Sequence, residues 1–240
     1  MSDGIWAAAS GAMNQLATLD TCANNVANAS TPGYKTEQII FKEVMAGAAQ
    51  RKDVRLSQIA QTSSDLTAAG SMATGRGLDV AFTGEGFFKV KVGEEEQYTR
   101  VGSFEVSKEG HLVDKSGADV LDRTGSAIAI PREAKAVEIA GDGTVTADGA
   151  RAGQLGVVKF DQGSMLERAE GQRYRATTRS GAAREIDATL ATGALEQSNA
   201  SPVRSMVDIV SAVRGFEVCE KAVEAFRDAD MRAAQAIMKA

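Results

Sequence analysis

The sequence predicts an α+β fold in which paired terminal helices form a coiled-coil-like layer and the middle of the chain forms an antiparallel all-β domain. Apolar residues near both ends recur at steps of three and four, which is the period of a helix. Apolar residues of the middle alternate with polar ones, which is the period of a strand. We therefore expect residues 1–35 and 196–240 to form one discontinuous helical domain, 36–77 an extended connector and 78–195 a β domain.

The N-terminal helix is predicted by an unbroken heptad seam, which is typical of a helix that packs along another helix. Three of the seven seam residues are alanine, so a partner backbone can approach closely there. Pro32 cannot continue a helix, and Gly33 can adopt a turn at low cost, so the helix should end before them. The seam consists of Ile5, Ala9, Ala12, Leu16, Leu19, Ala23 and Val26.

Residues 36–77 carry few periodic apolar residues and many small polar ones. We interpret them as a long connector with room for one hairpin. A loop of this length is unusual in a compact domain, so we expect neighbouring chains to order it.

The β domain is predicted by short alternating runs separated by turn residues. The alternating residues are Leu78, Val80 and Phe82, then Phe88, Val90 and Val92, then Phe104 and Val106, with Leu155, Val157, Val158 and Phe160 as a late strand. The turn signals are Gly84-Glu85-Gly86, Glu109-Gly110, Ser116-Gly117, Thr124-Gly125, Asp142-Gly143 and Asp148-Gly149. We expect the first of these to close a hairpin that Phe87 and Phe88 anchor.

The C-terminal helix begins where Ser201 can cap it and Pro202 suits its first position. Gly215 inside the helix indicates either a close helix contact or a local weak point, since glycine costs about 1 kcal/mol there against alanine. The apolar stripe of this helix consists of Met206, Ile209, Val213, Phe216, Cys219, Val223 and Phe226, and continues to Ala233 and Ile237.

The composition argues against several classes of function. The 240 residues include 27 Lys+Arg and 32 Asp+Glu without a basic run, so we expect no nucleic-acid partner. We also expect no membrane insertion, no cofactor and no metal, because no apolar run reaches membrane-span length and neither Cys22, Cys219 nor the sole histidine, His111, has ligand spacing. The two cysteines are either free thiols or a bridge between the terminal helices.

Three parts of the sequence resemble the flagellar axial proteins, the family of rod and hook subunits. The first is Ala23-Asn24-Asn25-Val26-Ala27-Asn28 followed by Thr31-Pro32-Gly33-Tyr34-Lys35, in which Val26 replaces the usual leucine. The second runs from Leu78-Asp79-Val80-Ala81-Phe82 through Gly84-Glu85-Gly86-Phe87-Phe88, Tyr98-Thr99-Arg100 and Gly102-Ser103-Phe104 to Gly110-His111-Leu112-Val113. The third is Leu195-Glu196-Gln197-Ser198-Asn199 with Arg214, Phe216 and Glu217, although Ala200 and Ser201 depart from the family's Val-Asn.

The resemblance implies a non-enzymatic subunit of the flagellar basal-body rod that polymerises through its terminal helices into the axial drive-shaft tube. Its implied partners are copies of itself, other rod proteins and the flagellar type III export apparatus, which exports such chains without a cleaved signal peptide. The N-terminus indeed lacks the charged start and apolar block of a secretory signal. The implied signature residues are Asn24, Asn25, Asn28, Thr31, Pro32, Gly33, Tyr34, Ser198, Asn199, Arg214 and Glu217.

Chain length and Leu195–Asn199 favour the proximal-rod type within this family. The alternatives are a distal-rod or hook-type subunit, a non-flagellar tubular filament subunit, and a secreted enzyme on a β scaffold with Asp79 and Glu85 as its acids. The asparagine-rich string before Thr31-Pro32-Gly33 argues against a generic filament, because helical assembly alone does not require it.

Overall fold

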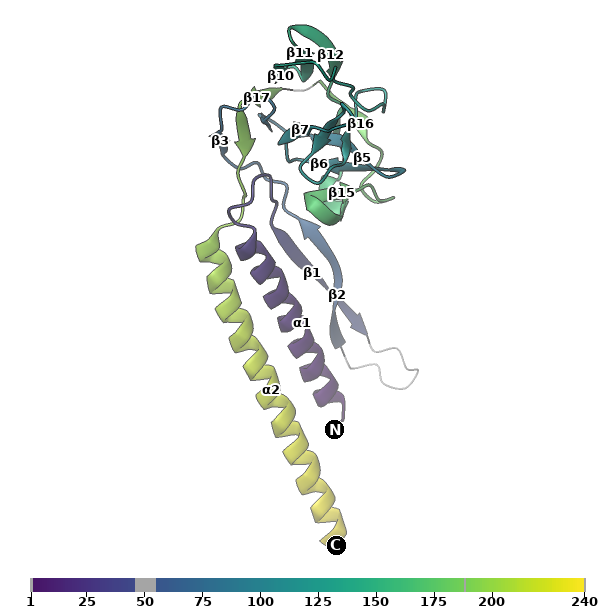
Figure 1. Ribbon diagram of the computed structural model, residues 1–240. Helices are drawn as coiled ribbons and strands as arrows, with labels where there is room; N and C mark the ends of the chain where they lie inside the picture. The colour runs from purple at the N-terminus through teal and green to yellow at the C-terminus, as the bar shows by residue number, and fades with distance from the viewer. Residues whose placement is uncertain (1, 46–54, 188, 240) are drawn as a thin grey trace. The chain divides into compact units, whose positions relative to one another are not determined.

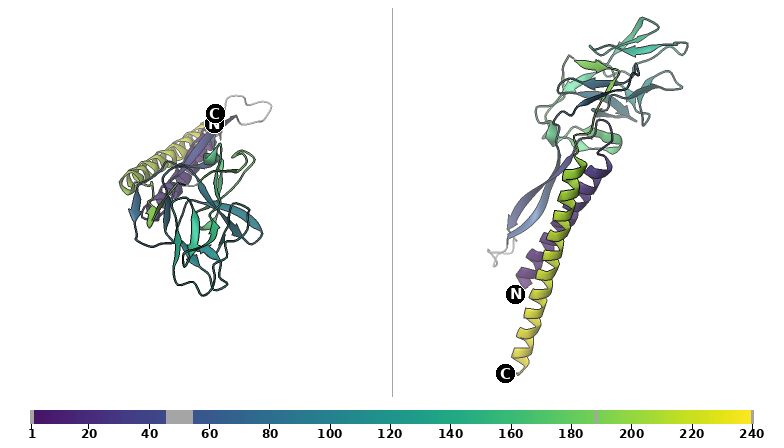
Figure 2. Two further views of the ribbon diagram at one scale, coloured as in Figure 1. Left: turned by 90° about the horizontal axis from the view of Figure 1, so that it is seen from above. Right: turned by 90° about the vertical axis from the view of Figure 1, so that its left-hand side faces the viewer.

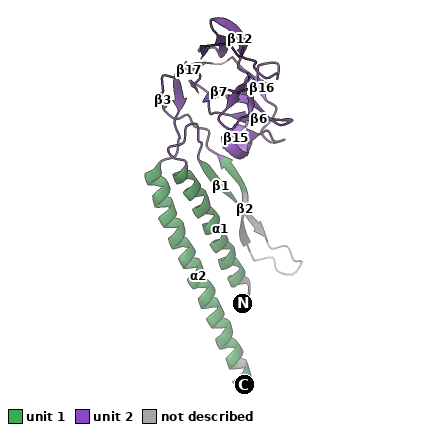
Figure 3. Cartoon of the chain, viewed as in Figure 1, with its two compact units in different colours: residues 1–27, 37–63, 201–240 green, residues 28–36, 64–200 purple. Residues whose placement is uncertain are grey.

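A computed structural model describes residues 2–45, 55–187 and 189–239. These residues fall in two compact units (Figure 3). Unit 1 contains residues 1–27, 37–63 and 201–240, and unit 2 contains residues 28–36 and 64–200. The predicted α+β class is confirmed. The units divide the chain differently from the expected domains, because residues 28–36 group with the β-rich unit and most of the expected connector groups with the helices.

Unit 1 contains two long helices, α1 (Ser2–Ala27) and α2 (Pro202–Lys239), which lie side by side and antiparallel (Figures 1 and 2). Their contact is close at small residues. A Cβ added to Gly11 would lie 3.1 Å from Cys219 Sγ, and one added to Gly215 would lie 2.8 Å from Gln15 Cδ. Gly215 therefore marks a close helix contact and not a local weak point. The last turns of α2 extend past the start of α1 (Figure 1).

The expected connector contains a two-stranded sheet, formed by β1 (Glu37–Met45) and β2 (Arg55–Ser64). Residues 46–54 lie outside the described residues. The described residues of the connector therefore lie mostly in extended strands, two of which pair, as an extended connector with one hairpin would have. In unit 1, β1 also lies beside α1, since Asn25 of the helix contacts Glu37 of the strand.

Unit 2 is built of short antiparallel strands. Its largest sheet has the order β14-β15-β6-β5-β9-β8-β7, with β13 joining β5 to β16. A separate three-stranded sheet has the order β10-β11-β12, and two further pairs are β17-β4 and β18-β3. The bounds are β3 Ser71–Ala73, β4 Val80–Phe82, β5 Phe87–Val92, β6 Glu95–Thr99, β7 Phe104–Val106, β8 Leu112–Asp114, β9 Asp119–Val120, β10 Val137–Ile139, β11 Thr144–Ala147, β12 Ala150–Gln154, β13 Val157–Lys159, β14 Glu167–Arg168, β15 Arg173–Arg175, β16 Arg184–Glu185, β17 Leu190–Thr192 and β18 Ala194–Glu196. Two single 3-10 turns cover Gly163–Met165 and Glu170–Gln172.

Strand β5 separates two apolar cores. Phe88 and Val90 belong to the larger core with Phe104, whereas Phe87 belongs to a smaller one with Tyr174. Successive side chains of a strand point to opposite faces, so Phe87 and Phe88 necessarily enter different cores. Phe88 and Phe104 meet edge to face with ring centroids 5.2 Å apart. Unit 2 thus contains apolar cores that are made entirely of its own residues.

Five of the six predicted turns are confirmed, and one is wrong. Residues 109–110, 116–117, 142–143 and 148–149 join paired strands, and 124–125 closes the bridge between Leu121 and Ala127. Gly84-Glu85-Gly86 closes no hairpin, because β4 pairs with β17 whereas β5 pairs with β6, β9 and β13. Glycines allow a sharp turn but do not determine which strands pair across it.

Candidate assembly interface

Both helices of unit 1 expose an apolar face. Trp6 and Met13 of α1 are 67% and 70% exposed, and Val203 of α2 is 74% exposed. On α2 the exposed residues share one face because their spacing follows the helical period. That α2 face, which we call the valine face, consists of Val203, Met206, Val207, Val210 and Val213. An exposed apolar face of this kind is a candidate interaction surface.

The predicted seam lies at the margin of the α1–α2 contact rather than at its centre. On α2 the buried positions are Ser205 and Ala212, each one residue before a predicted residue. Small residues allow the closest approach of two helices, so most of the larger apolar residues flank the contact. Phe226 and Cys219 of the predicted stripe are exceptions, because they lie against Gly4 and Gly11 of α1. Ile5, Ala9, Ala12, Leu19, Val26, Ile209, Phe216 and Val223 are half-buried, whereas Leu16, Ala23, Met206, Val213 and Phe226 are exposed.

The asparagines of the N-terminal signature have different environments. Asn25 is buried, its Nδ2 donates to Glu37 O at 3.0 Å, and its Oδ1 accepts from Glu37 N at 2.9 Å. This pair of bonds attaches the end of α1 to the first residue of β1. Asn24 is exposed, and Asn28 Oδ1 accepts a bond of 3.3 Å from Thr31 Oγ1. Asn25 therefore secures the end of the helix within unit 1, whereas Asn28 stabilises the turn that follows.

The turn at Thr31-Pro32-Gly33 belongs to unit 2. Gly33 has a φ of +70°, which side chains resist, and a Cβ there would lie 2.8 Å from Val101 Cγ2. Its N–H donates to Glu196 O at 2.7 Å. Tyr34 is fully buried, with the Arg168 guanidinium 4.4 Å above its ring. The turn is thus fixed by residues far away in the sequence.

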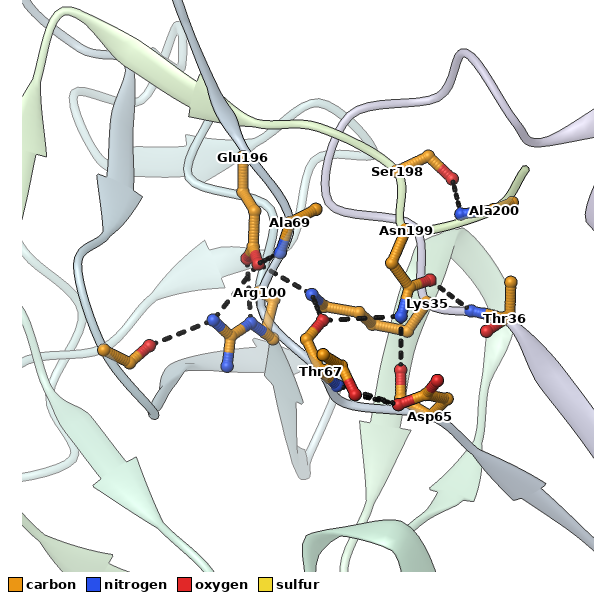
Figure 4. A network of polar contacts seen from close by, with 11 residues as sticks. Lys35, Thr36, Asp65, Thr67, Ala69, Arg100, Glu196, Ser198, Asn199 and Ala200 are labelled. Atoms are coloured by element: carbon orange, nitrogen blue, oxygen red, sulfur yellow. Dashed lines mark hydrogen bonds and ion pairs between the residues drawn. The ribbon is translucent and has the colours of Figure 1, made fainter. Parts of the chain in front are cut away.

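Lys35 follows the turn and enters a buried charged network that the sequence analysis did not predict (Figure 4). Its Nζ lies 2.6 Å from Glu196 Oε1, and Arg100 Nε donates to Glu196 Oε2 at 2.8 Å. All three side chains are at most 2% exposed. Burial would raise the pKa of the Glu196 carboxyl, but the hydrogen bonds and charges of Arg100 and Lys35 outweigh burial and hold that pKa below its usual value.

The C-terminal signature also divides between the units. Asn199 lies beside the charged network, and its Oδ1 accepts from Thr36 N at 2.8 Å (Figure 4). Ser198 Oγ accepts a local bond from Ala200 N. Arg214 and Glu217 lie on exposed positions of α2 in unit 1. Thus Ser198 and Asn199 lie in unit 2, and Arg214 and Glu217 belong to the helical layer.

The two cysteines are free thiols, and the alternative of a bridge is wrong. Cys219 faces Gly11, which is eleven residues before Cys22, so the thiols are about 16 Å apart along the helix. A disulfide cannot span that distance. Burial raises the pKa of the Cys22 thiol, and the carboxylate of Asp208 adds to the effect.

The two carboxylates considered as enzymatic acids have separate structural partners. Asp79 is buried and accepts hydrogen bonds from Ser103 Oγ and Thr74 Oγ1. Glu85 is exposed and pairs with Lys159. Within the described ranges, no group of three His, Cys, Asp or Glu residues could hold a metal ion, and no helix has the length and apolar character needed to span a membrane.

Three protein families match successive parts of the chain. "Flagella basal body rod protein" matches residues 5–35, "Flagellar hook protein FlgE/F/G D1 domain" residues 81–147, and "Flagellar basal body rod FlgEFG protein C-terminal" residues 191–236. The matches cover α1 with the turn, the first half of unit 2, and α2 with the segment before it.

Several complete proteins are similar over nearly the full length. The flagellar basal-body rod protein FlgF of Caulobacter vibrioides is 32% identical over 93% of each chain. FlgF of Escherichia coli is 32% identical over 95% of this chain and 94% of its own. FlgG of Bacillus subtilis is 29% identical over 93% of this chain and 94% of its own. The chain belongs to the family of flagellar basal-body rod proteins and is FlgF-like within it.

Proposed function

We propose that this chain polymerises into the axial tube of the rod through the exposed faces of its terminal helices. Family membership makes it a structural subunit of the rod in the flagellar basal body. The observation that supports helix-mediated assembly is the valine face, together with the exposed Trp6 and Met13 of α1. Unit 2 has apolar cores of its own, and most of the large apolar side chains that remain exposed in the described residues lie on the helices.

The proposed partners are other copies of this chain and other rod proteins. A position in the proximal rod is supported by the similarity to FlgF along nearly the whole chain. The residues that we assign to assembly are the predicted seam, the predicted stripe of α2 and the valine face. The exposed members of these sets face neighbouring subunits, except Phe226, whose ring lies against Gly4 of α1. The half-buried members support the α1–α2 pair.

Export by the flagellar type III apparatus without a cleaved signal is part of the same proposal. The support for this part of the proposal is membership of the rod-protein family.

We infer that the chain has no enzymatic role. The relatives are named as rod proteins, and Asp79 and Glu85 each satisfy a different partner instead of facing one reaction site. Turnover abolished by substitution of either carboxylate would contradict this inference.

Two neighbouring substitutions on α2 test the assembly surface. Val210→Asp introduces a charge at the centre of the valine face, and Ser211→Asp introduces the same charge one residue later, at another exposed position outside that face. Each variant is expressed in place of the native chain, in a strain from which the native gene has been deleted. We expect Val210→Asp to be exported but absent from purified rods, because burying an unpaired charge in an interface is costly. Ser211→Asp should assemble.

Normal rods and motility with Val210→Asp would refute helix-mediated assembly through this face. Circular dichroism of both purified variants checks that the helices still form. The position in the rod is tested separately by locating the subunit in a density map of the intact rod, where a distal position would contradict the proximal assignment.

A further inference from the structure

Three segments of unit 2 adjoin, in sequence, the points where the chain passes between the units. Residues 34–36 precede β1, residues 65–67 follow β2, and residues 196–199 lie just before α2. These segments are far apart in the sequence. Within unit 2 they are nevertheless side by side, and polar contacts join them (Figure 4).

Asn199 bonds to both of the other segments. Its Oδ1 accepts from Thr36 N at 2.8 Å, and its Nδ2 donates to Asp65 O at 2.8 Å. Its backbone N–H donates to Tyr34 O at 3.3 Å. An asparagine side chain offers one acceptor and one donor group, and both are used here on backbone atoms of different segments.

Direct bonds complete the set. Asp65 N donates to Thr36 O at 2.8 Å, which joins the first two segments without Asn199. Lys35 Nζ donates to Thr67 O at 2.7 Å and also forms the buried ion pair with Glu196. Each of the three segments is therefore bonded to both of the others.

We propose that Lys35, Asp65, Arg100, Glu196 and Asn199 form a junction clasp that sets the relative positions of these three segments. Lys35 and Asn199 are the positioning residues, because each contacts both other segments. Arg100 completes the coordination of Glu196 from inside unit 2. The clasp makes the segments one body, so a force transmitted along any of the three is distributed over all of them. This mechanical consequence rests on the proposed function in the rod, whereas the clasp itself does not.

Hydrogen exchange on the purified full-length chain tests the clasp without requiring assembly. In Asn199→Ala, the amide of Thr36 loses its acceptor and should exchange about tenfold faster, as expected for the loss of one net hydrogen bond. The amide of Val90 in the central strand β5 should keep its protection. Ser198→Ala is the matched control, since it removes only a local bond one residue away.

A second variant separates positioning from a general loss of stability. Asn199→Asp keeps the acceptor for Thr36 but removes the donor to Asp65. The carboxylate oxygen that replaces Nδ2 faces Asp65 O and repels it. We therefore expect protection to persist at Thr36 and to fall at the amide of Asp65, whose bond to Thr36 O requires the two segments to stay together. Unchanged exchange at both places, or equal acceleration at Val90, would overturn the proposal. Failure of the Val210→Asp assembly test would leave these exchange results unaffected, so the two ideas fail separately.

Discussion

Substituting Glu196 should destabilise unit 2 more than substituting any exposed acid on its surface. In Glu196→Ala, Lys35 and Arg100 both lose their carboxylate partner while remaining buried. Breaking a buried ion pair by removal of one partner typically costs about 3–5 kcal/mol, because the remaining charge is left uncompensated. We expect the free energy of unfolding of unit 2 to fall by about that amount.

Urea denaturation with two optical probes measures this loss. All three tyrosines, Tyr34, Tyr98 and Tyr174, lie in unit 2, and the sole tryptophan, Trp6, lies in α1. Near-ultraviolet circular dichroism of the tyrosines therefore reports on unit 2, and tryptophan fluorescence reports on unit 1. With a urea dependence of about 2 kcal/mol per M, the tyrosine midpoint should fall by roughly 2 M.

Two further variants sharpen the test. Asp161→Ala removes the carboxylate of an exposed ion pair with Arg184, so its cost should stay below about 1 kcal/mol. Adding Lys35→Met to Glu196→Ala removes one of the two stranded cations and should restore part of the lost stability. Equal midpoints for Glu196→Ala and Asp161→Ala would refute the reasoning.

Three other predictions follow from the same geometry. The folded pKa of Glu196 lies below its usual value of 4.5, so its contribution to the free energy of unfolding is complete above about pH 4.5 and is lost as pH falls through the folded pKa. Glu196→Gln should therefore lose less stability than the native chain between about pH 5 and pH 3, as measured by the tyrosine signal. Gly33→Ala should cost about 1–2 kcal/mol in urea denaturation from its left-handed backbone alone, and more from the contact with Val101; an unchanged midpoint would exclude that strain. Thiol labelling followed by mass spectrometry should modify Cys219 before Cys22, because Cys22 is buried and its thiol pKa is raised; faster modification of Cys22 would contradict the burial.

The spacing of apolar residues in the sequence predicted the helices and strands better than it predicted the contacts between them. Heptad spacing identified both helices, but the contact between them also uses small residues that it did not predict, such as Gly11, Ser205 and Ala212. Of the predicted stripe, Cys219 and Phe226 lie directly in the contact. Hydrophobic periodicity weights large side chains, whereas the closest approach of two helices depends on small ones. The stripe of small residues on α2, including Gly215, was the available signal.

The junction clasp was missed because its parts are far apart in the sequence. Lys35 and Glu196 are separated by 161 positions, and pattern reading relates only near neighbours. Each of them does occur within a recognised signature, directly after Tyr34 and directly after Leu195. A charged residue at an otherwise structural position of a motif could have suggested a buried pair. Arg100 also occurs in such a signature, Tyr98-Thr99-Arg100, but nothing in the sequence relates it to the other two residues.

The valine face explains why one contact alone should not suffice for assembly. Its five residues are about half exposed, so burying the remainder is worth roughly 1 kcal/mol each, or about 5 kcal/mol in total. Association costs about 4–15 kcal/mol in lost freedom of movement, so a single such contact approximately breaks even. A subunit becomes stably held only when other surfaces, such as the α1 face with Trp6 and Met13, are covered at the same time. We therefore expect the chain to remain monomeric in solution and to assemble where several neighbouring subunits are already in place.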